Sequence, residues 1–293
     1  MVSPSQRLFV KITRESLPQV KDKYPFLYLE RGRLEIDDSS IKWIDSENHV
    51  VPLPVATLNA LLLGPGTSIT HEAVKVATAA NCSVCWVGED SLLFYAAGFL
   101  PTADTRNLKR QIALATDPKK SLEVARAMFA RRFPEADLSG KSLQEMMGME
   151  GHRVRAMYRE KAEQYGVGWK GREFTPGKFD LSDITNQVLT STNAALYGIL
   201  CSVVHSLGYS PHIGFIHSGS PLPFVYDLAD LYKAELCIDL AFAVTRELAG
   251  RYDKHKVSAA FRERVLAMDL MGKAASDMTE LMGGGKRADR HRK

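Results

Sequence analysis

The sequence predicts an α+β fold in which an N-terminal β-rich domain is followed by a larger all-α domain. Three observations indicate this. Short apolar runs alternate with turn residues over residues 25–98, and a helical period begins near Asp104 and continues. The chain of 293 residues is 45% hydrophobic and 25% charged, which is globular composition with enough length for two domains. We place these domains at residues 1–99 and 100–282, followed by a basic, disordered tail at residues 283–293.

Turn signals such as Arg31-Gly32 separate the β-like runs of the first domain. The runs that we expect to be strands or apolar core segments are Phe26–Glu30, Arg33–Asp37, Ile41–Ile44, Val50–Leu53, Val55–Leu63, Cys82–Val87 and Leu92–Ala96. Thr70–Ala80 is typical of a short helix, with Thr70 as its N-cap. Seven short runs predict at least one sheet edge that needs covering.

Cys82 and Cys85 form a C-x-x-C motif on a predicted strand, where positions i and i+3 face opposite sides. That geometry suits neither a thiol pair nor a zinc site, so we expect two core cysteines. Four cysteines in a chain of this size do not indicate a disulfide framework. The N-terminus has no signal-peptide pattern, and the apolar stretch Leu196–Val204 is short for a membrane span. We therefore expect a cytoplasmic protein that has no membrane contact.

The second domain is predicted as a series of helices. A capping box, Ser142-Leu143-Gln144-Glu145, opens a long helix that runs to about Tyr165. Its apolar stripe is expected at Leu143, Met147, Val154, Met157 or Tyr158, and Ala162. The other helices are expected at Ser121–Phe133, from Asp183 or Thr185 to about Gly208, at Lys233–Ala249 and at Lys256–Leu281.

Glu150 falls on the stripe of the long helix, where an unpaired buried carboxylate is expensive. Gly148 and Gly151 flank it, and each costs about 1 kcal/mol relative to Ala inside a helix. Glycines at these positions allow a backbone or ligand to approach closely. Two broken local rules at one point favour a functional site. The alternative is an exposed Glu at the edge of the stripe.

Residues 214–231 place His217 in a small-residue loop ahead of a helix that carries Asp227 and Asp230. A spacing of three puts both carboxylates on one side of the helix, and the short loop lets His217 fold back over the helix start. Histidine with carboxylates suits a divalent metal. However, acidic residues near a helix start are also favoured by the helix dipole, without any metal.

The net charge of +4 is unevenly distributed. Residues 101–180 carry +5 and the tail carries +4, whereas residues 1–100 carry −2 and residues 181–282 carry −3. A basic segment beside an acidic one indicates a surface for a polyanion next to a metal site. A solvated helix face would give the same charges.

Three motifs together resemble the CRISPR-associated spacer-acquisition integrases, the Cas one family. They are Gly148-Met149-Glu150-Gly151 with Arg153 and Arg155, Gly214-Phe215-Ile216-His217-Ser218-Gly219, and Phe224-Val225-Tyr226-Asp227-Leu228-Ala229-Asp230. The similarity runs from about residue 25 to residue 270. Leu63-Gly64-Pro65-Gly66-Thr67 and Tyr165-Gly166-Val167 resemble the type I-E branch. No role is transferred to the tail.

The resemblance implies a metal-dependent DNA endonuclease and integrase that acts with a second protein, Cas two, as a homodimer formed through the β domains. It implies that Glu150, His217 and Asp230 bind Mg²⁺ or Mn²⁺, with Asp227 close behind. His217 could instead be a general base. Tyrosines Tyr165 and Tyr197 would line the path of the DNA. The basic residues expected to hold phosphates are Arg106, Lys109, Arg110, Arg131, Arg132, Arg153, Arg155 and Arg159.

The chemistry implied is transesterification, in which a DNA 3′-hydroxyl attacks a phosphodiester and a divalent ion stabilises the developing charge. Two alternatives remain open. One is a structure-specific nuclease for branched DNA that uses the same metal site without integration. The other is a DNA-binding scaffold whose acidic cluster is only structural.

Overall fold

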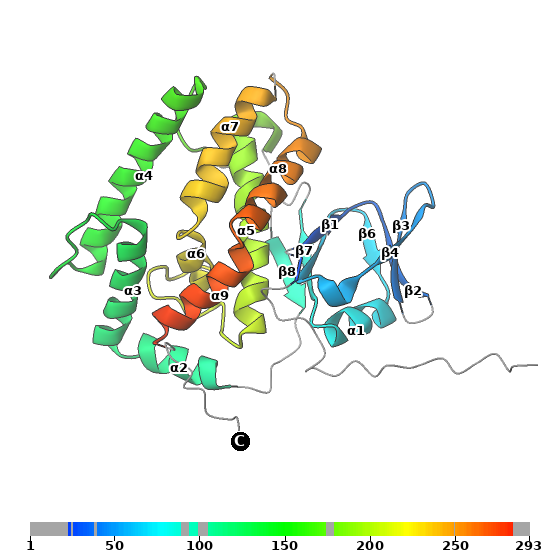
Figure 1. The fold of residues 1–293 in the computed structure, drawn as a ribbon, viewed down its shortest axis with the longest axis horizontal. Helices are drawn as coiled ribbons and strands as arrows, with labels where there is room; N and C mark the ends of the chain where they lie inside the picture. Colours follow the sequence, from blue (N-terminus) through cyan, green and yellow to red (C-terminus); the bar gives the residue numbers. More distant parts are fainter. Residues whose placement is uncertain are drawn as a thin grey trace, which may run out of the picture.

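A computed structural model describes residues 23–24, 26–37, 40–88, 94–98, 105–173, 179–248 and 250–283. Its strands gather at one end of the molecule and its larger helices at the other (Figure 1). The predicted α+β class is therefore confirmed. The expected domain boundary near residue 99 and most of the expected tail lie outside the described residues, so both stay predictions.

Among the described residues, the β-rich region contains two four-stranded sheets and one α-helix. The strands are β1 (Leu27–Leu29), β2 (Gly32–Asp37), β3 (Ser40–Asp45), β4 (Val50–Leu53), β5 (Ala60–Leu63), β6 (Thr67–Ile69), β7 (Ser83–Val87) and β8 (Phe94–Gly98). A 3-10 turn, η3 (Val55–Thr57), and a helix, α1 (His71–Ala79), complete it. The hydroxyl of Thr70 accepts a hydrogen bond from the N–H of Ala73, as expected of an N-cap.

The first sheet has the order β1-β5-β7-β8, with parallel pairs except between β7 and β8. The second has the order β4-β3-β2-β6, antiparallel except for the parallel pair β2 and β6. Side chains alternate across β5, so that Leu62 faces the helical region while Leu61 and Leu63 face the second sheet and α1. Cys85 and Cys82 are likewise buried in these two different clusters, which confirms them as core residues.

The helical region is built from eight α-helices among the described residues, with one π segment and one 3-10 turn. The α-helices are α2 (Arg106–Ala115), α3 (Pro118–Arg132), α4 (Leu143–Tyr165), α5 (Ile184–Ser206), α6 (Pro223–Ala229), α7 (Leu240–Glu247), α8 (Lys254–Ala267) and α9 (Leu270–Leu281). The 3-10 turn is η5 (Phe179–Leu181), and the π segment is η6 (Ala234–Asp239).

Helix α5 lies at the centre of the helical region and also contacts the β region (Figure 1). Among the described residues it alone is long and apolar enough to cross a membrane, by length and composition. Most of it is buried inside the protein, however, so it is a core helix. Ser202 accepts a hydrogen bond from Asn59 Nδ2 at 2.5 Å, which fixes α5 against the first sheet. One continuous hydrophobic cluster therefore joins both regions.

The structure differs from the expected elements at four points. The apolar run Val55–Leu63 contains a 3-10 turn before β5, and β6 was not predicted. Lys256–Leu281 is two helices, since Asp269 adopts a left-handed conformation with φ 47° and caps α9. On α4 the buried methionine is Met146, while Met147 is 43% exposed. The other predicted positions of the stripe pack against the core as expected: Leu143, Val154, Met157, Tyr158 and Ala162.

Candidate active site

Helix α4 carries Glu150 near its middle, and local sequence signals fix where this helix begins and ends. The Ser142 hydroxyl accepts a hydrogen bond from the N–H of Glu145, and the Glu145 carboxylate accepts one from the N–H of Ser142. This is the predicted capping box. Gly166, with φ 67°, ends the helix in the left-handed conformation that glycine adopts without strain.

Glu150 forms an ion pair with Arg132, the last residue of α3. The Glu150 side chain is 18% exposed, so it is neither fully buried nor a free surface carboxylate. A Cβ at Gly148 would meet no described atom within 4 Å. The expected close approach of a backbone at Gly148 is therefore not found among the described residues, and open space adjoins the glycine instead.

His217 is held by Asp227, a fully buried carboxylate in α6. One oxygen of Asp227 accepts hydrogen bonds from the N–H groups of Phe215 and Ile216, at 2.6 and 3.1 Å. The other oxygen accepts one from the N–H of His217 at 2.9 Å and lies 2.8 Å from its Nδ1. Asp227 thus folds the loop onto the helix, and the Nδ1 contact leaves Nε2 as the ring nitrogen available to a ligand.

This folding requires a glycine at position 214. A Cβ there would lie 2.8 Å from Cβ of Pro223 and 3.0 Å from Oδ2 of Asp227. Any larger residue would separate the loop from α6.

Asp230 follows α6, and its two carboxylate oxygens face different cations. Oδ1 lies 2.8 Å from Nζ of Lys233, and Oδ2 lies 3.7 Å from Nη1 of Arg132. Oδ2 also lies 3.8 Å from Nε2 of His217. Arg132 therefore contacts both Glu150 and Asp230, and His217 lies beside Asp230, although no three His, Cys, Asp or Glu side chains of the described residues are grouped as metal ligands. We call Glu150, His217, Asp227 and Asp230 the His/carboxylate site.

Charge at the site shifts the pKa values of two cations. The hydrogen bond to Asp227 raises the pKa of His217 above its ordinary value, with Asp230 adding to the effect and burial opposing it. Burial also opposes the charge of Lys233, but Asp230 and Tyr197 outweigh it and raise the pKa of Lys233. The Lys233 ammonium lies 5.0 Å from the centre of the Tyr197 ring. Lys233 therefore stays charged at neutral pH.

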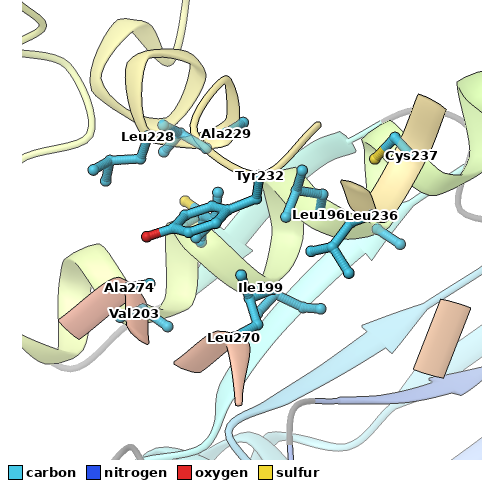
Figure 2. Packing of buried hydrophobic residues seen from close by; sticks show 14 of the residues in the cluster. Leu196, Ile199, Val203, Leu228, Ala229, Tyr232, Leu236, Cys237, Leu270 and Ala274 are labelled. Carbon is cyan, nitrogen blue, oxygen red and sulfur yellow. The ribbon is translucent and has the colours of Figure 1, made fainter. Parts of the chain in front are cut away.

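Tyr232 anchors the segment that carries Asp230 and Lys233. Its ring is 1% exposed and lies among Leu196 and Ile199 of α5, Leu236 of η6 and residues of α9 (Figure 2). Its hydroxyl donates to Asp277 Oδ2 at 2.6 Å. A buried aromatic body with a satisfied hydroxyl fixes a chain position strongly. The π segment η6 begins directly after Lys233, and π turns occur frequently at functional sites.

The predicted phosphate-binding residues lie on three helices. Arg106, Lys109 and Arg110 are exposed on α2, and Arg155 and Arg159 are exposed on α4. Arg153 is half-buried, and its guanidinium lies 4.8 Å from the centre of the Phe133 ring. Arg131 pairs with Glu280 at 2.7 Å, on the α9 side of α3. Arg132 is placed inside the site instead of on the surface.

The two predicted tyrosines lie in different places. Tyr197 is at the site, beneath Lys233 and edge-on to Tyr226 at 4.9 Å. Tyr165 lies fifteen residues beyond Glu150 on α4, about 22 Å along the axis at the helical rise. Its hydroxyl donates to Asp239 at 3.1 Å. Tyr165 is therefore separate from the His/carboxylate site, and its contact with DNA stays a prediction.

Sequence reasoning missed Lys233 as a site residue. The signal that could have found it is its spacing of three from Asp230, the spacing of an ion pair on a helix. The position of Arg132 had no such signal, because α3 and α4 meet only through tertiary packing.

The same fold occurs in solved structures of Cas1 proteins. The crystal structure of TtCas1 superimposes with a TM-score of 0.80 at 34% identity, covering 90% of this chain and 98% of that one. The TtCas1-DNA complex gives a TM-score of 0.67 at 38% identity, covering 92% and 100%.

Sequence comparison agrees with the fold. Residues 129–258 match the family model for the CRISPR associated protein Cas1. A CRISPR-associated endonuclease Cas1 of Chlorobaculum tepidum is 65% identical over 277 residues, 94% of each chain. The Cas1 of Escherichia coli is 33% identical over 267 residues, 91% of this chain and 89% of its own length. The chain therefore belongs to the Cas1 family of CRISPR-associated endonucleases, and the resemblance seen in the motifs is confirmed.

Proposed function

We propose that this protein is a metal-dependent DNA endonuclease and integrase that inserts DNA fragments as new spacers into a CRISPR array. The single observation that carries the proposal is the convergence of Glu150, His217 and Asp230 from three separate segments. The relative solved with DNA supports a nucleic-acid substrate. The type I-E branch, the partner Cas two and a cytoplasmic location belong to the same proposal.

The chemistry of the donor groups suits Mg²⁺ or Mn²⁺. Glu150 and Asp230 offer hard carboxylate oxygens, and His217 offers Nε2, because its Nδ1 is engaged with Asp227. Asp227 would support the site from behind, since both of its oxygens already accept hydrogen bonds. When bound, the ion would polarise a phosphoryl oxygen and favour the alkoxide form of the attacking hydroxyl.

The remaining groups have roles that follow from their positions. Asp227 fixes the orientation and tautomer of the His217 ring. Lys233 holds Asp230 and keeps a positive charge beside it. If Nε2 of His217 binds no ion, it can accept a proton from the attacking hydroxyl, so the ligand and base roles remain alternatives. Exposed cations on α2 and α4 would hold the DNA backbone without reading its sequence.

Strand joining tests the proposal. The protein, candidate Cas two, a pre-spacer and a repeat-containing plasmid are incubated with Mg²⁺ or with chelator. We expect joining only with metal, and loss of joining in Glu150→Ala, His217→Ala and Asp230→Ala. The three residues act as one unit, so double variants should lose little more than single ones. Glu160→Ala, on the exposed side of the same helix, is the matched control.

The outcomes separate the alternatives. Cleavage of branched DNA without joining would indicate a structure-specific nuclease. DNA binding that is equal in chelator, without any joining or cleavage, would indicate a scaffold. Full activity in any of the three alanine variants would remove that residue from the site.

A further inference from the structure

Arg132 occupies an unusual position for a basic residue of a DNA-binding protein. Its Nη2 donates to Glu150, and its Nη1 lies 3.7 Å from Oδ2 of Asp230. The side chain is only 7% exposed. The guanidinium therefore lies between the two carboxylates that would hold a divalent ion.

Aromatic rings hold Arg132 in this position. The guanidinium carbon lies 5.6 Å from the centre of the Phe129 ring and 5.2 Å from that of Phe133, and both phenylalanines are buried. Such contacts are favourable for a cation on a ring face. The preceding residue, Arg131, points the other way and pairs with Glu280. The placement of Arg132 is thus specific to that residue.

One nitrogen of Arg132 remains unsatisfied. Nη1 is buried, and no described residue accepts a hydrogen bond from it. An unmet buried donor costs about 1–3 kcal/mol, more when it is charged. Because Nη1 lies 3.7 Å from Oδ2 of Asp230, an acceptor that arrives beside this carboxylate would satisfy it. A non-bridging phosphate oxygen is the acceptor that suits a guanidinium best.

Because it is positively charged, Arg132 would compete with a metal ion for the carboxylates of Glu150 and Asp230. Three carboxylates (Glu150, Asp227, Asp230) face two cations, Arg132 and Lys233, so that the site carries −1 with a neutral imidazole. Among the described residues, no three His, Cys, Asp or Glu side chains stand close enough to hold a metal in this arrangement. In this arrangement the guanidinium of Arg132 lies between Glu150 and Asp230.

We propose that Arg132 is the resident countercation of the metal-free site and that, when a divalent ion replaces it there, Nη1 turns to a phosphate oxygen of the DNA. The inference rests on the proposed metal-dependent function. It makes Arg132 a coupling residue: metal loading would free its guanidinium from Glu150 and Asp230, so that Nη1 could reach the substrate phosphate.

The deciding measurement is the affinity for Mn²⁺ in the absence of DNA. The electron paramagnetic resonance signal of free Mn²⁺ reports how much of the ion is bound. We compare wild type with Arg132→Met and with the matched control Arg131→Met. Removing the competing charge should tighten Mn²⁺ binding in Arg132→Met by roughly threefold or more, because like charges near the site repel the ion. Arg131→Met should match wild type. Unchanged or weaker binding in Arg132→Met would mean that Arg132 only positions Glu150, and would overturn the proposal.

A measurement on the wild-type protein removes any dependence on the folding of Arg132→Met. With ¹⁵N-labelled arginine, the side-chain Nε signal of Arg132 is assigned by its loss in Arg132→Lys. Titration with diamagnetic Mg²⁺ should shift this signal while that of Arg131 stays. A stationary Arg132 signal at saturating Mg²⁺ would contradict the release of the guanidinium.

DNA affinity tests the second half of the proposal. Arg132→Met should weaken binding of a short duplex about tenfold in Mg²⁺, the scale of one charge-assisted hydrogen bond, and clearly less in chelator. An equal loss in both conditions would make Arg132 an ordinary phosphate contact and overturn the coupling.

Control variants keep the two proposals distinguishable. Glu150→Ala and His217→Ala should lose Mn²⁺ binding. If they do so while Arg132→Met matches wild type, only the inference about Arg132 fails. If wild type itself binds no Mn²⁺ that depends on Glu150 and His217, the proposed metal-dependent function fails and the inference about Arg132 fails with it.

Discussion

Nδ1 of His217 lies 2.8 Å from Oδ1 of Asp227, while the other oxygen of that carboxylate accepts hydrogen bonds from two backbone N–H groups. A single buried side chain therefore closes the loop and orients the imidazole. Loop structure and site chemistry depend on the same residue, which separates Asp227 from Asp230 in what their substitution should do.

We predict that Asp227→Asn impairs strand joining less than Asp230→Asn does but destabilises the protein more. Asparagine at 227 would present an amide where three backbone N–H groups now donate, at a cost of about 1–3 kcal/mol. Asparagine at 230 removes a charge that faces cations instead of backbone N–H groups, so its effect on folding should be smaller. Urea unfolding and joining assays of both variants check this. An equal loss of joining in Asp227→Asn and Asp230→Asn would indicate that both carboxylates bind the metal ion directly.

His205, in the last turn of α5, predicts an acid-sensitive component of stability. Burial, with help from the nearby His212, lowers the pKa of His205 from 6.5 to about 4. The unfolded chain therefore binds a proton between those pH values when the folded protein does not, so stability falls as pH drops from about 6.5 to 4. We expect His205→Gln to reduce this loss by about 3 kcal/mol at full effect, since the shift is about 2.5 pKa units and each unit corresponds to about 1.4 kcal/mol.

Urea unfolding at pH 7.5 and pH 4.5 measures the difference between wild type and His205→Gln. Carboxylates that titrate in the same range act in both proteins and cancel. His71→Gln is the control, because that side chain is exposed on α1. Identical pH dependence in wild type and His205→Gln would show that His205 does not couple to folding.

Arg155 and Arg159 are exposed on α4, and neither forms an ion pair with an acidic side chain in the part of the chain that the structure describes. We predict that replacing both by Gln weakens duplex binding and reduces its salt dependence. Each phosphate that is no longer neutralised should lower the slope of log affinity against log salt by about 0.9. Fluorescent duplex titrated at several salt concentrations provides the slope.

A double replacement of Arg153 and Arg155 is the comparison for that experiment. Arg153 stacks on Phe133, so its replacement should cost stability as well as charge. Arg131→Gln serves as the control, because Arg131 already pairs with Glu280. If the slope of Arg155→Gln/Arg159→Gln matches that of wild type, these two arginines do not contact DNA phosphates and are only solvated surface residues.

The homodimer is expected to form through the β region. Strand β4 is an edge of the second sheet, and Val50 and Val51 on it are 57% and 49% exposed. Exposed apolar edges are sites of association. Sedimentation at micromolar concentration should show a dimer in wild type and a monomer in Val50→Lys/Val51→Lys. Leu181→Lys, at another exposed apolar residue, should stay dimeric. Dimeric Val50→Lys/Val51→Lys would place the interface elsewhere.

Local signals predicted much of the fold. Ser142 with Glu145 located the start of α4, Thr70 capped α1, and Asp183 caps α5 as one of two expected choices. These succeeded because a cap depends on residues within one turn of each other. The break at Asp269 was missed because an aspartate in the left-handed region leaves no apolar gap in the sequence pattern.

The sequence alone determined which residues could form the site: a carboxylate on an apolar stripe, and a histidine loop before two aspartates three residues apart. It could not determine that Arg132 lies between Glu150 and Asp230. These contacts join α3, α4 and α6, which are brought together only by burial of apolar faces against α5 and its neighbours. Residue identity fixes which chemical groups are available, whereas packing decides which charges meet. Electrostatic pairing depends on distance in space, and Arg132 and Asp230 are far apart along the chain.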